Sequence, residues 1–251
     1  MLISRTKAAI IHLAISLLVA LTVAGAVFLL WYPKPYHHLS GGTNLFLMII
    51  GIDLTIGPAL TLVIFNRAKP ASELRRDILI IVVLQIVALI YGSSVAFQAR
   101  PTHLVFEYNR FRVVHAGAEV PEGILEKATR AIDMNPLVGP MYVGLKPIDP
   151  KDRTSILMQE LSGYPVANRA DMWVPYEGVK DQVIKAARPL SDLESKLSAG
   201  EIEKIYEFQR ALDENSDNLT YLPVISRFGM AAAILRKGSE KVLGIIEVRW
   251  S

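Results

Sequence analysis

Three long apolar segments in the first hundred residues constrain the fold of this chain more than any other feature. They run from Ala8 to Leu30, from Leu45 to Phe65 and from Ile78 to Phe97. As helices they would each span about 30 Å or more, which matches the hydrocarbon core of a bilayer. The first is longer than the apolar part of a cleaved signal peptide, and Trp31 follows it where small residues would be expected. We therefore predict a membrane protein with three retained transmembrane helices within residues 1–99.

Basic residues orient these helices, because short loops rich in Lys and Arg stay on the cytoplasmic side of a membrane. Arg5 and Lys7 precede the first helix, whereas the loop after it contains only Lys34. The loop between the second and third helices contains four basic residues: Arg67, Lys69, Arg75 and Arg76. The N-terminus is thus predicted to be cytoplasmic, and the chain after Arg100 to be exported.

The formal charge of +3 by itself invites a nucleic-acid interpretation. Residues 1–99 carry seven basic and three acidic side chains, a net charge of +4, so residues 100–251 carry −1. The basic excess is therefore a topology signal, and we predict a lipid bilayer but no nucleic acid as a partner. The chain has no Cys, so its exported part gains nothing from disulfides.

Residues 100–251 are predicted to form one α+β domain. His103 to Tyr108 and Phe111 to His115 are rich in β-branched and aromatic residues and lie two residues apart, which indicates paired strands. Pro140 to Leu145 is a third predicted strand.

The C-terminal region has the layout of a β-hairpin, with strands from Phe228 to Leu235 and from Val242 to Val248. The second of these is almost continuously apolar, so we expect it to be central in the sheet. The Ala cluster at 231–233 leaves a helix open as an alternative for the first.

Helices are predicted from Pro121 to Asn135 and from Asp149 to Gly163, with Ile156, Leu157 and Leu161 on one face. Two further helix starts have the Ser-x-x-Glu spacing of a capping box: Ser191 with Glu194, and Ser198 with Glu201. Residues 164–178 are expected to be irregular.

No catalytic, nucleotide-binding or metal-binding motif occurs in the sequence. The G-x-S-x-G, H-E-x-x-H, Walker A and G-x-G-x-x-G patterns are all missing, and the five His are scattered. We therefore predict a protein that is not an enzyme, with no catalytic residue, no metal and no cofactor.

Asp53 is the single charge within the second apolar segment, where it costs about 2.5 to 3.5 kcal/mol on insertion, so its carboxylate needs a partner. Counting about 1.5 Å per residue places Asp53 roughly 12 Å below the outer boundary and His12 roughly 27 Å below it. We expect that the two do not meet and that His12 reaches toward the headgroups. On the third helix, Asp53 is level with Gln85, Tyr91 or Ser93, which are the predicted internal partners.

A second hypothesis is that Asp53 faces a helix of another protein. Asp53, Gly57 and Thr61 share one stripe of their helix, and Gly92 lies in a stripe of small residues on the third, a pattern that lets helix backbones approach closely. Pro58 removes a backbone donor and can kink the helix. The candidate residues for internal packing or partner contact are Asp53, Gly57, Pro58, Thr61, Gln85, Tyr91 and Gly92.

An ordered set of short motifs runs through the membrane half. It comprises Trp31-Tyr32-Pro33-x-Pro35, Gly41-Gly42, Gly51-x-Asp53-Leu54-x-x-Gly57-Pro58-x-Leu60-Thr61-Leu62, Phe65-Asn66, Leu74-Arg75-Arg76-Asp77, Gln85, Ala88-Leu89-x-Tyr91-Gly92 and Arg100-Pro101. In these motifs the chain resembles the TfpX/TfpZ-type pilin accessory proteins of Gram-negative bacteria, densely in the membrane half and loosely in the exported half.

The resemblance implies a chaperone-like accessory factor in the bacterial inner membrane that supports the stability, assembly or dynamics of a type IV pilus. We expect the helices, around Asp53, Gly57 and Gln85, to contact the membrane helix of a major pilin. The periplasmic domain after Arg100 would then contact the head of the pilin.

Arg75, Arg76 and Asp77 of the cytoplasmic loop also match the family pattern. They are candidates for contact with a pilus-assembly component of the inner membrane, although topology predicts the positive charge by itself. An alternative function is a membrane-anchored periplasmic sensor that binds a small ligand and acts through a partner. A pilin-modifying enzyme is less favoured, because no activated nucleophile, metal set or nucleotide loop is present.

Overall fold

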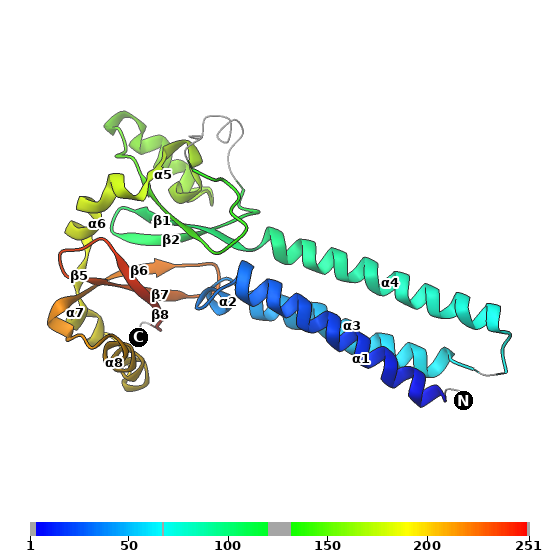
Figure 1. The fold of residues 1–251 in the computed structure, drawn as a ribbon. Coiled ribbons are helices and arrows are strands. Elements are labelled where there is room, and N and C mark those ends of the chain that lie inside the picture. The colour runs from blue at the N-terminus through cyan, green and yellow to red at the C-terminus, as the bar shows by residue number, and fades with distance from the viewer. Residues whose placement is uncertain (1–3, 67, 120–131, 250–251) are drawn as a thin grey trace.

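The structure, a computed structural model, describes residues 4–66, 68–119 and 132–249. Three long helices extend side by side from one end of a mixed domain, with the N-terminus at the far end (Figure 1). They are α1 (Arg5–Gly25), which continues as a π-helix η1 (Ala26–Trp31), α3 (Gly42–Ile64) and α4 (Ala71–Gln98). All three are long and apolar enough to cross a membrane, so the prediction of three spans is confirmed.

The third helix begins earlier than predicted, directly after Pro70. Arg75, Arg76 and Asp77 therefore lie on the first turns of α4 rather than in a loop. Helix formation continues beyond the apolar run because no residue after Pro70 breaks it. Lys69 Nζ lies 2.7 Å from Asp77 Oδ2 and closes this end of the helix with an ion pair.

The domain after α4, which we call the exported domain after the topology predicted from the sequence, is built on a mixed sheet of eight strands. The strands are β1 (Pro101–Glu107), β2 (Arg110–His115), β3 (Met141–Leu145), β4 (Trp173–Pro175), β5 (Arg188–Pro189), β6 (Leu219–Ile225), β7 (Met230–Arg236) and β8 (Val242–Glu247). Their order is β4-β3-β1-β2-β6-β7-β8, with β5 beside β6. Within the described part of the chain, the parallel pairs are β1–β3 and β2–β6, and the other pairs are antiparallel. The β1–β2 pair, β3 and the C-terminal hairpin are confirmed, as is the α+β class.

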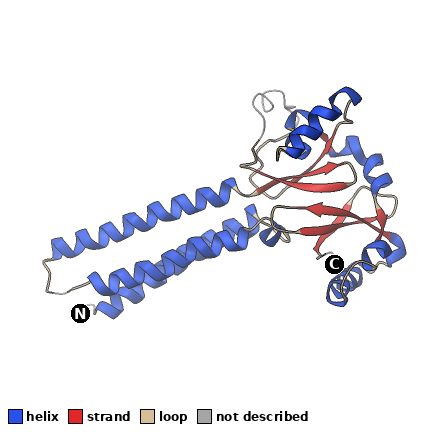
Figure 2. Ribbon diagram, turned by 180° about the vertical axis from the view of Figure 1, so that it is seen from behind, coloured by secondary structure: helices blue, strands red, loops and turns tan. Residues whose placement is uncertain are grey.

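Short helices surround the sheet (Figure 2). They are α2 (Tyr36–Leu39), α5 (Arg153–Leu161), α6 (Lys180–Ala186), α7 (Leu190–Glu194) and α8 (Ala199–Leu212), with 3-10 turns η3 (Pro150–Asp152), η4 (Val166–Asn168), η5 (Ala170–Met172), η6 (Tyr176–Val179) and η7 (Ser216–Asn218). The helix predicted from Pro121 to Asn135 falls almost entirely outside the described residues. Ser198 occupies the N-cap position of α8 as predicted, but its side chain accepts no capping hydrogen bond. The other predicted start is wrong, because Ser191 lies inside α7.

The last strand is not central, contrary to the prediction, because β8 lies at the edge of the sheet. The inner strand of the hairpin is β7, and the alanines form that strand rather than a helix. Ala231 and Ala233 pack into one core cluster while Ala232 packs into another, so both faces of β7 are covered. The apolar run of β8 is explained by α8, since Phe208 packs over the backbone at Gly244.

Strand β6 was missing from the sequence-based prediction, because Pro223 lies near its middle and proline normally marks an edge strand. The structure shows how this proline is accommodated. On one side of β6, β5 pairs with Thr220 and Tyr221, and β2 pairs with Val224 and Ile225. Pro223 lies in the gap between these two partners, where no ladder requires its missing N–H.

The connection between α1 and α3 packs into the exported domain. Tyr36 and Leu39 of α2 belong to the same buried cluster as Leu222 of β6. Leu39 O also accepts a hydrogen bond from Phe228 N at 3.1 Å. The outer end of the α1–α3 pair and the domain are thus one packed unit, which places them on the same side of any membrane that the helices cross.

The junction between α4 and β1 is fixed by a buried arginine. Arg100 is 1% exposed, and its guanidinium stacks on the ring of Phe97 at 3.6 Å. It donates to Asn135 Oδ1 at 2.7 Å and to Pro136 O at 3.2 Å. Tyr32, at the end of the first span, donates to Ala96 O at 2.8 Å. The junction therefore ties the outer ends of the helices to the domain.

Candidate functional site

The middle helix of the membrane half is α3, which packs against both α1 and α4. α4 runs apart from α1 over most of its length (Figures 1 and 2). Two glycines allow α3 and α4 to approach. A Cβ at Gly92 would lie 2.7 Å from Cγ1 of Ile49, and a Cβ at Gly57 would collide with the side-chain amide of Gln85. The structure thus places both predicted small-residue positions at the α3–α4 contact.

Four polar side chains from the three helices meet between them, and we call them the membrane polar cluster: His12, Asp53, Thr61 and Gln85. His12 Nδ1 lies 2.6 Å from Thr61 Oγ1, and His12 Nε2 lies 2.6 Å from Gln85 Oε1. Gln85 Nε2 donates to the main-chain oxygen of Asp53 at 3.3 Å. These bonds join α1 to α4 across α3.

The prediction for His12 was therefore wrong, because its ring lies inside the helix group and does not reach toward headgroups. His12 lies deeper than Asp53, but Thr61, two turns farther along α3, is level with His12. The long side chain of Gln85 spans the difference in depth between His12 and the main chain of Asp53. A single glutamine thus links two residues at different depths.

Asp53 is 6% exposed, and its Oδ1 has no hydrogen-bond partner among the described residues. Gln85 reaches only its backbone. Tyr91 is 72% exposed, and neither Tyr91 nor Ser93 bonds to Asp53 in the described part of the chain. The predicted internal clasp on the carboxylate therefore does not form, and a buried carboxylate oxygen remains unsatisfied.

A cavity of about 450 Å³, which we call the membrane cleft, lies between α1, α3 and α4 and contains the whole membrane polar cluster. Its walls are otherwise largely apolar, with side chains from both outer helices: Ile11, Ile15, Val19, Val82, Ile86 and Leu89. Pro58 is half-buried outside this lining, and α3 continues through it as one helix. The cleft can therefore take an apolar surface that carries a hydrogen-bond donor for Asp53.

The exported domain has its own buried titratable groups, which sequence reasoning missed. The ring of His103 packs against Trp173, with the ring centroids 4.3 Å apart, and burial lowers the pKa of His103 to about 4. Burial likewise lowers the pKa of His115 to about 4. Glu107 is fully buried and lies 2.7 Å from Arg112, and burial raises its pKa against the effect of that arginine. Among the described residues, no three His, Asp or Glu side chains gather closely enough to hold a metal ion.

Comparison with known proteins gives a consistent result. The family model of the fimbrial assembly protein FimB matches residues 1–41. The fimbrial assembly protein of serogroup E1 of Dichelobacter nodosus is 29% identical over 239 residues, which cover 95% of this chain and 93% of the relative. The serogroup I protein of the same organism matches to the same extent.

A third relative is shorter but more similar. The fimbrial assembly protein of Dichelobacter nodosus serogroups C1 and C2 is 40% identical over 107 residues, which cover 43% of this chain and 82% of the relative. No solved structure matches the chain significantly. The identity to this relative over most of its length, together with two matches along nearly the whole chain, shows that the protein belongs to the fimbrial assembly protein family.

Proposed function

We propose that this protein is a non-enzymatic, chaperone-like accessory factor of type IV pilus assembly, of the TfpX/TfpZ type. It sits in the bacterial inner membrane with its N-terminus in the cytoplasm and its α+β domain in the periplasm. Membership of the fimbrial assembly family supports the role in assembly. The basic residues around Arg75 and Arg76 support the orientation, since both are exposed at the end of α4 away from the domain.

In this proposal the client is a major pilin, and one face of its membrane helix packs into the membrane cleft. The observation that carries the proposal is the unsatisfied carboxylate of Asp53. A polar group without a partner in hydrocarbon costs several kcal/mol. The free protein therefore lacks a hydrogen-bond donor for Asp53 Oδ1 among its described residues. A donor on the client helix at the depth of Asp53 satisfies that oxygen and gives the contact its position along the helix.

The exported domain and the cytoplasmic end of α4 have separate roles in the same proposal. The domain after Arg100 contacts the periplasmic head of the pilin. Arg75 and Arg76, which point into solvent beyond the cleft, contact an assembly component on the cytoplasmic side. The junctions at Arg100 and at α2 hold the helices and the domain together, which supports a constant distance between these two contacts.

The experiment that tests this function exchanges Asp53 for Asn in the full chain, in cells that produce the pilin. Total accessory protein, total pilin, surface pili and twitching are measured separately. We expect normal abundance of the variant and fewer surface pili, because Asn keeps the shape but removes the charge that a client donor meets. Thr55→Val on the lipid-facing side of α3 is the matched control and should leave pili unchanged.

Two results would contradict the proposal. Loss of the variant protein itself would mean that Asp53 stabilises the three helices rather than a client. Normal abundance with normal pilin, pili and twitching would mean that the carboxylate contacts nothing needed for assembly.

A further inference from the structure

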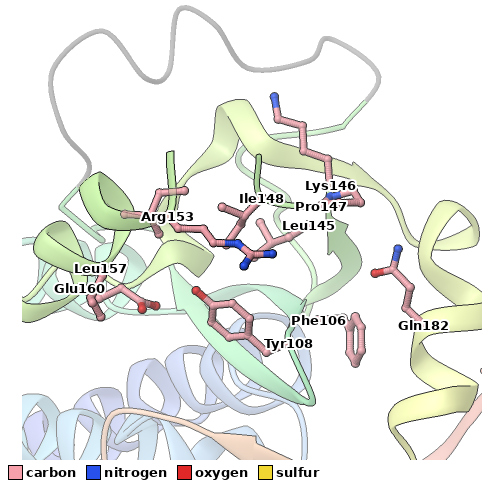
Figure 3. Close-up of a pocket in the computed structure, with 11 residues that line it drawn as sticks. Phe106, Tyr108, Leu145, Lys146, Pro147, Ile148, Arg153, Leu157, Glu160 and Gln182 are labelled. Carbon is pink, nitrogen blue, oxygen red and sulfur yellow. The ribbon is translucent and has the colours of Figure 1, made fainter. Parts of the chain in front are cut away.

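A second cavity, of about 510 Å³, lies in the exported domain between the end of β1, the loop after β3, α5 and α6 (Figure 3). Phe106, Leu145 and Ile156 are buried and form an apolar floor. Its volume is in the range of sites that bind ligands or single side chains of a partner. Nothing in the relation to fimbrial assembly proteins assigns a role to this pocket.

Arg153 lines the pocket and has no bonding partner among the described residues. Arg153 is the first residue of α5, and Figure 3 shows its side chain extending across the pocket. Among the described residues it forms no hydrogen bond or ion pair, unlike Arg112 and Arg169, which pair with acidic side chains. Glu160 lines the same pocket, but its carboxylate accepts from Val166 N at 3.3 Å and does not lie within ion-pair distance of Arg153.

The other cation of the pocket is already engaged. Lys146 Nζ donates to Asp171 O at 3.1 Å, and Figure 3 shows it pointing away from the cavity. Arg153 is therefore the group that would meet an incoming ligand. A guanidinium presents paired donors that fit a carboxylate, and such a bond is strong where one side of the group rests on apolar surface.

Tyr108 borders the pocket in a backbone conformation that its residue type rarely adopts. Its φ is +55°, in a two-residue turn between β1 and β2, a conformation that Gly and Asn adopt more readily than Tyr. Strain of this kind persists where the surroundings fix it, and it gathers at binding sites. Here the turn carries the phenol to the edge of the pocket, where burial and Glu160 raise the pKa of Tyr108.

The surface next to the pocket distinguishes a polypeptide from a small ligand. Leu157, Met158 and Leu161 of α5 are 53%, 60% and 74% exposed. Leu157 and Leu161, which the sequence pattern places on one face with Ile156, are therefore not buried with it. A small molecule in the cavity would leave Met158 and Leu161 in water, whereas a chain segment running along α5 would cover them.

The position of the pocket indicates which part of a partner can reach it. Tyr108 follows Arg100 by eight residues of extended chain, which is roughly 25 Å beyond the outer end of α4. This point lies outside the hydrocarbon core that the helices span. The partner segment therefore belongs to the part of the partner that lies on the same side of the membrane as the domain.

We infer that this pocket binds an extended peptide segment of a partner's exported domain, with an Asp or Glu carboxylate on Arg153 and a neighbouring apolar side chain on the floor at Phe106. The inference rests on the proposed function for the identity of the partner and adds the chemistry that the exported domain recognises.

The test uses the full-length protein in lipid nanodiscs and a phage library of random heptapeptides. We expect enriched peptides that carry Asp or Glu beside Leu, Ile, Phe or Met. For a synthetic copy of an enriched peptide, Arg153→Gln should weaken binding by about tenfold or more, the loss expected for one charge-assisted hydrogen bond. Arg153→Glu should abolish it. Lys151→Glu is the control, because this side chain is 75% exposed and lies outside the pocket lining.

The variants should unfold at the same temperature as the native protein, because Arg153 forms no bond with any residue that the structure describes. Enrichment of peptides without an acid would overturn the inference, as would equal weakening by Lys151→Glu and Arg153→Glu. A small organic acid that co-purifies in the pocket, detected by native mass spectrometry, would also overturn it. Crosslinks from the membrane cleft to pilin that persist in Arg153→Glu would show that the proposed function stands even where this inference fails.

Discussion

The exported domain and the membrane helices bury their apolar side chains to very different extents. In the domain, Leu104, Val105 and Ile234 represent three clusters whose central side chains have no exposure. In the membrane half, only 22% of the apolar window of α3 and 6% of that of α4 is buried. Lipid tails are as apolar as leucine, so helices in a bilayer gain little from burying such residues against each other.

This difference shows that the two halves are held together in different ways. Packing defines the domain, whereas a few polar bonds and two glycines define how the membrane helices meet. Gln85 is the main link, since it touches His12 and the backbone of Asp53 and lies over Gly57. A client helix can therefore enter the cleft without breaking a packed core, which the domain would not permit.

The same substitution, Leu to Ala, should cost much more stability in the domain core than on the exposed face of a membrane helix. Leu222 has no exposure in the domain core, so Leu222→Ala should destabilise the protein by about 2 to 5 kcal/mol. Leu29, which is 74% exposed on the first span, should cost less than about 0.5 kcal/mol as Ala. Chemical unfolding in detergent, followed by tryptophan fluorescence, measures both. Similar losses at the two positions would contradict the contrast.

Acid should destabilise the domain through its buried histidines. With a folded-state pKa of about 4 against an ordinary 6.5, His103 and His115 bind fewer protons when folded than when unfolded. Their stabilisation is complete above pH 6.5 and is lost as the pH falls toward 4, by up to about 3 kcal/mol for each. The raised pKa of Glu107 works in the opposite sense and offsets a part.

Thermal unfolding between pH 7 and 4.5, followed by the fluorescence of Trp173, measures this effect. The double variant His103→Gln with His115→Gln should have a flatter pH profile. A native protein whose unfolding temperature does not change over this range would show that the two rings are accessible to protons in the folded state.

A smaller effect than those of Leu222 and of acid is expected for the coupling within the membrane polar cluster. His12→Leu, Gln85→Leu and the double variant form a cycle, with a predicted coupling of about 0.6 to 1.7 kcal/mol, as for polar contacts between membrane helices. Stability in micelles against a denaturing detergent measures it. Strictly additive losses would mean that the bond between His12 and Gln85 does not hold α1 to α4.

The membrane spans could be predicted because lipid imposes a length and a composition that are visible in the sequence. Which polar groups meet could not be predicted from depth alone. Depth nominated Gln85, Tyr91 and Ser93 as partners of Asp53, but Gln85 bonds only to its main-chain oxygen and Tyr91 is exposed. Depth also placed His12 near the headgroups, because it did not include the reach of a glutamine between two helix levels. A hydrogen-bond inventory for every polar side chain at similar depth would have suggested His12, Thr61 and Gln85 as one group.

In the exported domain the sequence predicted local pairs better than long-range ones. The β1–β2 and β7–β8 hairpins depend on neighbouring residues, so their patterns were sufficient. The parallel pairing of β2 with β6 joins residues more than a hundred positions apart, and Pro223 concealed β6. The edge position of β8 depends on the cover that α8 provides, which no property of the strand itself reveals.

The central claim is that a client helix lies in the membrane cleft, and a matched pair of photo-crosslinking positions on α4 tests it most directly. Ile86 lines the cleft, whereas Leu84, two residues away and 60% exposed, does not. With a photoreactive residue at each position in turn, we predict pilin adducts from Ile86 and few or none from Leu84. Equal adducts from both positions, or adducts from neither while pilin accumulates normally, would contradict the account.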